Sequence, residues 1–256
     1  MKVNNNENQT EVLSKVPALT LAFWAIKVAA TTLGETGGDA VSMSMDLGYL
    51  VSTIIFAAIF LVTMFFQVKS KKFHSMTYWT TIIATTTVGT TLADFATRSL
   101  GIGYTGGSIL LLTLLGASLA IWYRSTGSIS VNTVNNAKSE IYYWVTIMFS
   151  QTLGTALGDW AADSMDFGYT GAALIFGSLL GVTAALYFWT KVSRVTLFWA
   201  AFILTRPLGA VVGDFLDKPT AKGGLELSRY TASFAILVFI AIAIAVFPNR
   251  AAKSVH

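Results

Sequence analysis

The stretch TTLGETGGD, residues 31–39, decides how this chain folds, because its frame occurs four times. The other copies are TTVGTTLAD at 86–94, QTLGTALGD at 151–159 and RPLGAVVGD at 206–214. In every copy a Gly stands five residues before the final Asp, and a Gly or Ala directly precedes that Asp. Recurrence of one frame along a chain is the signature of a repeat architecture. The sequence is therefore a fourfold repeat.

The four copies are arranged as two pairs. Asp39 and Asp94 are 55 residues apart, as are Asp159 and Asp214, whereas Asp94 and Asp159 are 65 apart. The segment SMDLGY at 44–49 also returns as SMDFGY at 164–169, which is 120 residues later. The simplest history is a two-helix unit that was doubled, after which the pair was doubled.

Composition indicates a membrane protein. Of the 256 residues, 54% are hydrophobic and only 12% are charged, whereas a soluble domain has about 25% charged residues. Eight apolar segments each approach the ~20 residues that cross a bilayer as a helix. They are 16–33, 49–68, 76–96, 104–123, 141–161, 169–189, 195–215 and 227–247. We therefore expect an all-α integral membrane protein, an eight-helix transmembrane bundle built from four two-helix repeats.

The chain divides into two similar halves. We expect a polar N-terminal tail at 1–15, a first half at 16–123, a polar linker at 124–140, a second half at 141–247 and a C-terminal tail at 248–256. Lys and Arg are concentrated in the tails, the linker and the loops between repeats. By the positive-inside rule both termini and the linker are cytoplasmic. The expected location is the bacterial cytoplasmic (inner) membrane, with the lipid bilayer as the main partner.

Residue inventory argues against several function classes. The chain has no Cys and only two His, His74 and His256, so thiolate and imidazole chemistry are disfavoured. No P-loop, nucleophile–base pair or metal-ligand spacing stands out, so we expect neither an enzyme nor a cofactor. The net charge of +4 fits membrane topology, and we expect no nucleic-acid partner.

The first span of each repeat carries a polar stripe. Residues eight and four positions before each Asp share its helix face, and a lipid-facing stripe would be costly, so the stripes are expected to face one another. Two basic residues, Lys27 and Arg206, also lie deep in spans, and each is expected to have an acidic partner near the centre. The candidate site residues are Thr31, Glu35, Asp39, Thr86, Thr90, Asp94, Gln151, Thr155, Asp159 and Asp214.

These residues predict a site for a small ion or solute. A set made of oxygen donors favours a hard cation such as Mn²⁺, Mg²⁺ or Ca²⁺, or Na⁺ or H⁺, over Zn²⁺ or Cu⁺. For a metal ion, the expected ligands are Glu35, Asp39 and Asp159. Lys27 and Arg206 are open to two interpretations. They are counter-ions of the carboxylates, or they bind an anionic or zwitterionic substrate while the acids carry protons.

The four frames resemble a bacterial membrane-protein family that is defined by a repeat of unknown function, with TLGETxGD-like units followed by GY. The likeness runs from Lys27 to about residue 229 and implies a multi-span bundle. Copy four departs from the pattern: Arg206-Pro207 replaces Thr-Thr, Ala210 replaces the acidic position, and no GY follows. A weaker similarity is to cation/proton exchangers with paired ExGD motifs, although Glu35 and Asp39 are one residue further apart.

Two functions from different classes fit these features. The first is a secondary transporter or exchanger with a central carboxylate-lined site for a hard cation or a proton-coupled small solute. The alternative is a structural or interaction protein whose motif Asp residues hold helix packing. The motif glycines fit both, since they permit close helix packing or a helix break that lines a cavity. The DLGY and DFGY segments are interpreted as turns, and a homo-oligomer is allowed.

Overall fold

Four helices form a closed ring at the centre of the protein. The computed structural model describes residues 13–247 and 250–253. The ring consists of α1 (Leu21–Asp39), α3 (Ser75–Asp94), α5 (Ala137–Asp159) and α7 (Arg194–Asp217). Each packs against two neighbours, in the order α1, α3, α5, α7 and back to α1. All four copies of the repeated frame therefore belong to this inner ring.

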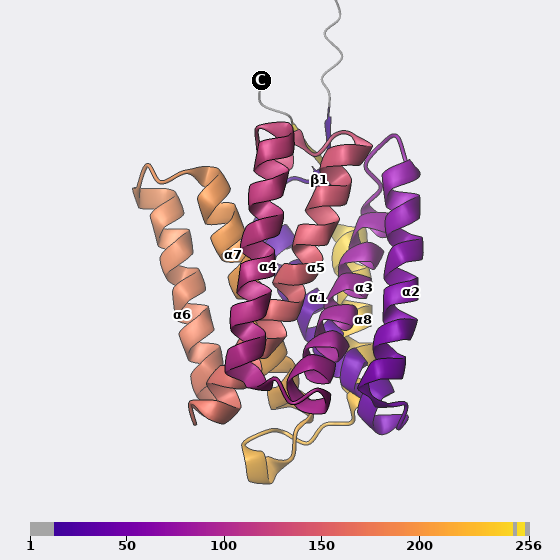
Figure 1. The fold of residues 1–256 in the computed structure, drawn as a ribbon, viewed down its shortest axis with the longest axis vertical. Coiled ribbons are helices and arrows are strands. Elements are labelled where there is room, and N and C mark those ends of the chain that lie inside the picture. Colours follow the sequence, from indigo (N-terminus) through magenta and orange to yellow (C-terminus); the bar gives the residue numbers. More distant parts are fainter. Residues whose placement is uncertain (1–12, 248–249, 254–256) are drawn as a thin grey trace, which may run out of the picture.

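The remaining four helices of the described chain cover the ring from outside (Figure 1). They are α2 (Gly48–Lys69), α4 (Gly103–Thr126), α6 (Gly168–Trp189) and α8 (Arg229–Val246). Each outer helix packs mainly on the inner helix of the next repeat: α2 on α3, α4 on α5, α6 on α7, and α8 on α1. We call this arrangement a pinwheel: the outer helix of each repeat covers the inner helix of the next repeat, and the outer helix of the fourth repeat covers the inner helix of the first.

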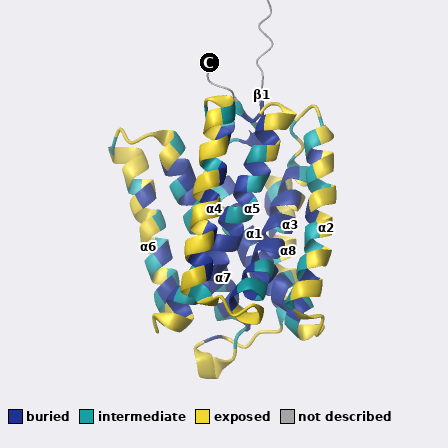
Figure 2. Ribbon diagram, viewed as in Figure 1, coloured by how far each residue is buried: buried dark blue, intermediate teal, exposed yellow. Residues whose placement is uncertain are grey.

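The outer helices present apolar side chains to the surroundings, and exposed residues gather on them (Figure 2). Among the described residues, five helices are long and apolar enough to cross a membrane: α2, α4, α6, α7 and α8. Such helices are typical of a membrane protein. The inner helices α1, α3 and α5 are of similar length but carry many Thr and acidic residues, which lowers their hydropathy. Their polar side chains are buried in the ring.

Close approach between neighbouring inner helices depends on the motif glycines. A Cβ atom on Gly34 would overlap the side chain of Thr86, and one on Gly209 would overlap that of Thr31. The helices run unbroken through these positions, so the glycines serve packing rather than a helix break. The same contact joins Gly89 to Gln151 and Gly154 to Arg206.

A wider, π-helical turn follows the motif Asp in the first three repeats, at Ala40–Ser44, Phe95–Ser99 and Trp160–Ser164. The chain then reverses through Asp46, with φ of 55°, and Asp166, with φ of 58°. This left-handed backbone is uncommon for non-glycine residues but several-fold enriched for Asp. Asp46 and Asp166 thus lie in turns, as predicted, and the Gly and Tyr of each segment begin the next outer helix. Copy four differs, because α7 continues to Asp217 and a 3₁₀ turn follows at Thr220–Lys222.

The two ends of the described chain meet. Strand β1 (Leu13–Pro17) pairs antiparallel with β2 (Ala251–Lys253), at one end of the bundle (Figure 1). Helix α1 starts shortly after β1 and ends at its motif Asp, so the motif Asp residues lie at the other end. Lys15 is buried there, forms an ion pair with Glu140 and donates a 2.8 Å hydrogen bond to the carbonyl of Gln67.

The predicted terminal tails differ from the structure where it describes them. Residues 13–15 and 251–253 lie in strands rather than tails, because β1 and β2 pair with each other. Glu140 compensates the charge of the buried Lys15. Residues 1–12, 248–249 and 254–256 lie outside the described chain. The first helix begins at Leu21 rather than 16, since Thr20 caps it by accepting a hydrogen bond from the backbone of Phe23. The expected linker at 124–140 contains the end of α4, a 3₁₀ turn at Val131–Thr133 and the start of α5.

Candidate functional site

Two contacts between opposite helices locate the axis of the ring. Lys27 Nζ on α1 lies 3.4 Å from Gln151 Oε1 on α5. Arg206 Nη2 on α7 donates a 2.6 Å hydrogen bond to Thr90 Oγ1 on α3. In the ring, α1 is opposite α5 and α3 is opposite α7. The polar stripes therefore face one another, as predicted from the cost of exposing them to lipid.

Equivalent positions of the four inner helices form layers along this axis, and every residue in them is buried. The acidic layer lies at the end of the ring away from β1, and the layers follow at intervals of four residues. From that end they are Asp39, Asp94, Asp159 and Asp214; then Glu35, Thr90, Thr155 and Ala210; then Thr31, Thr86, Gln151 and Arg206; then Lys27, Ile82, Ile147 and Phe202; then Phe23, Tyr78, Tyr143 and Phe198. The axis thus changes from acidic to polar to aromatic.

Arg206 connects all four inner helices. Its Nη1 and Nη2 atoms both lie 3.1 Å from Glu35 Oε2 on α1. Nη2 also donates to Thr90 Oγ1 on α3 and, at 2.5 Å, to Thr155 Oγ1 on α5. The predicted acidic partner of Arg206 is therefore Glu35. Hydrogen bonds between charged groups are about twice as strong as neutral ones, so this guanidinium braces the centre of the ring.

The four motif carboxylates are joined in pairs by two cations. Arg98 Nε lies 3.1 Å from Asp94 Oδ1, and its Nη2 lies 3.1 Å from Asp159 Oδ2. On the other side of the ring, Lys218 Nζ contacts Asp39 and lies 3.0 Å from Asp214 Oδ1. Each cation comes from one repeat and reaches the Asp of the next one.

Sequence reasoning missed Arg98 and Lys218, although a signal was present. Each follows the motif Asp of its own copy by four residues, which places it on the same helix face. Burial lowers the pKa of Lys218, but Asp214 and Asp39 raise it by more, so its pKa lies above the ordinary value. Lys218 is therefore a charged ammonium within the carboxylate cluster.

The tyrosines of the GY dipeptides also reach this end of the ring. Arg98 Nη1 donates to Tyr49 Oη over 3.3 Å, and Tyr104 Oη donates to Asp163 Oδ2 over 3.2 Å. Copy four has no GY, and Arg229 lies at the corresponding corner, 2.9 Å from Asp217 and 3.9 Å from Asp39. This cation was not among the predicted site residues either.

Two of the predicted threonines bind backbone rather than side chains on the axis. Thr31 Oγ1 donates to the carbonyl of Thr205 on α7 over 3.1 Å, and Thr86 Oγ1 donates to the carbonyl of Ala30 on α1 over 3.1 Å. These bonds cross the interfaces where the motif glycines allow close approach. Their hydroxyls therefore hold the ring closed, whereas Thr90 and Thr155 bind Arg206.

The prediction of an acidic partner for Lys27 is wrong for the described chain, where no carboxylate oxygen lies within 4.0 Å of its Nζ. The reason is that Glu35 stands two turns away and binds Arg206 instead. Besides Gln151, the ammonium lies over the ring of Phe202, 4.2 Å from its centre.

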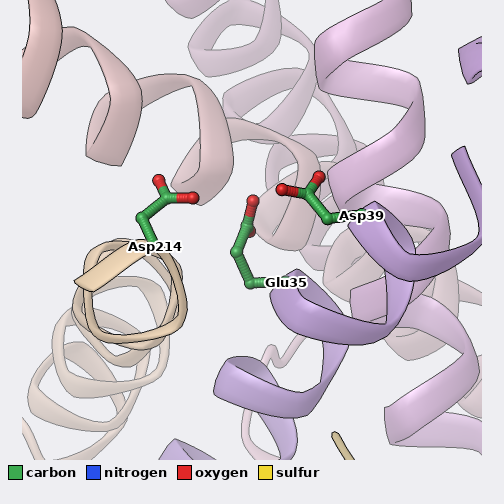
Figure 3. A group of neighbouring side chains, drawn as sticks. All are labelled: Glu35, Asp39 and Asp214. Atoms are coloured by element: carbon green, nitrogen blue, oxygen red, sulfur yellow. The ribbon is translucent and has the colours of Figure 1, made fainter. Parts of the chain in front are cut away.

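The carboxylates that could hold a metal ion are Glu35, Asp39 and Asp214, whose oxygens lie within 4.8 Å of one another. Figure 3 shows them pointing toward a common space between α1 and α7. The predicted trio had Asp159 in place of Asp214, but α5 is opposite α1 and Asp159 pairs with Arg98. Carboxylate oxygens suit hard cations. Because Lys218 contacts Asp39 and Asp214, such a cation would compete with its ammonium group.

Comparison with known proteins agrees with the repeat and supplies no function. The sequence matches the family described as Repeat of Unknown Function (DUF347) over four segments, residues 22–73, 77–128, 142–193 and 197–250. Each segment contains one inner and one outer helix. No curated protein and no solved structure matches the chain. With four copies that cover most of its length, the chain belongs to the DUF347 repeat family, as its TTLGETGGD frame suggested.

Proposed function

We propose that this protein spans the bacterial cytoplasmic membrane eight times, with both termini in the cytoplasm. The five apolar helices support a membrane location. In the pinwheel α1, α3 and α5 lie alongside them and are of similar length, 19 to 23 residues. Surrounding helices allow polar inner spans at membrane depth, since these face the interior of the bundle. Excess Lys and Arg near the β1 end supports the orientation.

Within this topology, we propose that the protein is a secondary transporter or exchanger for a hard cation or a proton-coupled small solute. The observation that carries the proposal is the ring of four buried Asp residues bridged by Arg98 and Lys218. Ionisable residues inside a membrane are costly and mark ion pathways and proton relays by default. Asp39 Oδ1 is buried and has no hydrogen-bond donor among the described residues, which supports a role in binding.

The chemistry of such a site is competition between cations. A proton or metal ion that binds Asp39 and Asp214 neutralises the charge that holds Lys218. Release of this side chain would loosen the contact between α1 and α7 at the acidic end of the ring. A ligand shifts a conformational equilibrium only through its different affinity for the two states, and displacement of Lys218 provides such a difference.

Proteoliposomes with a pH-sensitive dye inside test the proposal. Pulses of NaCl, KCl, MgCl₂, MnCl₂ or CaCl₂ are applied outside, and the internal pH is recorded for empty and protein-containing vesicles. We expect at least one cation, or an imposed proton gradient alone, to drive proton movement that requires the protein. Asp39→Asn and Asp159→Asn should each abolish this movement.

Asp166→Asn is the matched control, because it removes one carboxylate from an exposed turn where Asn tolerates the left-handed backbone. This variant should transport like wild type. Full activity in Asp39→Asn or Asp159→Asn would overturn the assignment of the motif carboxylates. Proton movement that is equal in empty vesicles for every condition would overturn transport of these ions.

The alternative is a structural or interaction protein, favoured by the network in which Arg206 binds Glu35, Thr90 and Thr155. A cross-brace of this kind needs no ligand. It predicts that Asp39→Asn and Asp159→Asn lower the melting temperature, and that no ion changes it. A selective stabilisation by one ion that both variants lose would exclude this alternative.

A further inference from the structure

Lys27 is a basic residue in a layer that is otherwise apolar. At the equivalent positions of the other inner helices stand Ile82, Ile147 and Phe202, and all four residues are fully buried. The next layer toward β1 is aromatic and contains Phe23 and Tyr78 among its four members. The repeat does not require a lysine at this position, because the other three copies have apolar side chains there.

No carboxylate of the described chain lies within 4.0 Å of the Lys27 amine. Its Nζ atom reaches the neutral Gln151 Oε1 at 3.4 Å and the face of the Phe202 ring at 4.2 Å. Charges buried in protein are paired or hydrogen-bonded, since an unpaired charge is strongly unfavourable. Arg206, one layer away, is already paired with Glu35. A charged Lys27 amine therefore needs an anion that the described chain does not supply.

Two further donors beside Lys27 lack acceptors. Gln151 Nε2 and Arg206 Nε are buried and have no hydrogen-bond partner in the described chain. Both belong to the layer next to Lys27, on α5 and α7. Buried polar groups are nearly always hydrogen-bonded, and exceptions call for a specific reason. The Lys27 amine, an amide N–H and a guanidinium N–H thus come from three helices in two adjacent layers of the axis.

We propose that Lys27, Gln151 and Arg206 bind the carboxylate group of a small organic acid, which is the solute that the protein transports. Two carboxylate oxygens accept several charge-assisted hydrogen bonds at once, which suits these donors. The neighbouring Ile82, Ile147 and Phe202 suit a short apolar substituent. The inference rests on the proposed transport function for the identity of its solute, while binding itself can be measured separately.

This site and the carboxylate cluster lie at different depths along the axis. Lys27 and Asp39 are twelve residues apart on α1, which is about 18 Å along a helix with a rise of ~1.5 Å per residue. Glu35 and Arg206 lie between them as an ion pair. A solute anion at one end and a cation or proton at the other would be bound along one axis, as a symporter of small monocarboxylates requires.

Melting of the purified protein in detergent tests the inference. Sodium acetate, propionate and butyrate are titrated at constant ionic strength against sodium chloride and against neutral propionamide. A carboxylate that binds should raise the melting temperature, by on the order of 5–10 °C at a hundredfold excess over Kd. Lys27→Met should lose this shift, and Gln151→Leu should reduce it. Lys191→Met, which removes an exposed lysine, should keep it.

The outcomes separate this inference from the proposed function. Lys27→Met should retain any stabilisation by cations or pH that wild type shows, whereas Asp39→Asn should lose that effect and keep the propionate shift. An equal shift with chloride would overturn the carboxylate specificity. A propionate shift that survives in both Lys27→Met and Gln151→Leu, or its absence from wild type, would overturn the site. If Lys27→Met does not fold, Lys27→Gln and Gln151→Leu decide.

Discussion

Arg98 and Lys218 hold equivalent positions 120 residues apart, and each joins the Asp of its own repeat to the Asp of the next. The acidic layer is therefore twofold rather than fourfold in its charges. The two cations differ in chemistry, because guanidinium is a fixed fork that suits two carboxylates whereas ammonium is a compact point charge. On the Lys218 side the oxygens of Glu35, Asp39 and Asp214 lie within 4.8 Å of one another, so a metal ion would compete with the ammonium group there.

Removing Lys218 should destabilise the fold. Lys218→Met leaves Asp39 and Asp214 close together without their shared cation, and breaking a buried ion pair costs about 3–5 kcal/mol. Lys218→Arg should lose much less, since it keeps the charge. Thermal or denaturant unfolding in detergent measures both, with Lys222→Met at an exposed site as the control. Equal stability of Lys218→Met and the control would contradict the role of this ion pair.

A divalent cation should partly rescue the same variant. In Lys218→Met the oxygens of Glu35, Asp39 and Asp214 remain within reach of one another, and no ammonium competes for them. Mg²⁺ or Mn²⁺ should therefore raise the melting temperature of Lys218→Met more than that of wild type. Adding Asp214→Asn to Lys218→Met should remove the difference. The same metal-induced shift in both proteins would show that the ion does not bind where Lys218 lies.

Glu35 and Arg206 should be strongly coupled. Glu35→Gln leaves a fully buried guanidinium without its carboxylate, and Arg206→Met leaves the carboxylate unpaired. Each should cost about 3–5 kcal/mol, whereas removal of both charges together should cost less than the sum. A double-mutant cycle of unfolding free energies measures the coupling. Additive losses would mean that the 3.1 Å contact contributes nothing to stability.

The motif glycines should not tolerate even one methyl group. In Gly209→Ala the new Cβ would overlap Thr31, so the helices must separate, and overpacking of this kind costs about 1–3 kcal/mol. Gly177→Ala on α6 is the matched control, since its Cβ would meet nothing within 4 Å. That change should be neutral or stabilise by about 0.5–1 kcal/mol. Destabilisation of both variants by the same amount would argue against close packing at Gly209.

Membrane topology can be read from single cysteines, because the natural chain has none. Lys71→Cys lies in the α2–α3 loop and Lys222→Cys in the α7–α8 loop, and both positions are exposed. With eight spans and cytoplasmic termini, a membrane-impermeant maleimide should label Lys222→Cys in intact spheroplasts. It should label Lys71→Cys only after the membrane is permeabilised. The reverse pattern would invert the orientation, and labelling of both would argue against the span count.

Much of the architecture could be predicted because the same frame is written four times. Small residues around each Asp and the polar positions one and two turns earlier require helices that meet face to face. The order of helices around the ring could not be predicted from the sequence. The spacing of the frame defines the repeated unit, but it does not show which units are adjacent in space. This is why Asp159 was expected beside Glu35 in place of Asp214, which lies on the adjacent helix α7.

The sequence predicted which residues belong to the candidate site better than it predicted which of them bind one another. The inward-facing carboxylates and the charge of Arg206 follow from their cost in lipid. The partners of these carboxylates could not be predicted in the same way. Arg98 and Lys218 lie just beyond the spans and resemble loop residues whose charges set the orientation in the membrane. The β1–β2 pairing was also beyond prediction, because it joins five residues to three from the two ends of the chain. Such short strands have no periodicity to detect.

The pinwheel closes the four repeats into a ring, although no covalent bond joins the fourth repeat to the first. Helix α8 covers α1 as α2 covers α3, and β1 and β2 bring the two ends together at the same end of the bundle. Each of the three joints between successive repeats is therefore equivalent to the gap between the termini. A circular permutant that links the ends and opens between α4 and α5 would retain every interface of the ring. Likewise, the first and second halves, with two repeats each, could assemble the same ring as separate polypeptides without any linker.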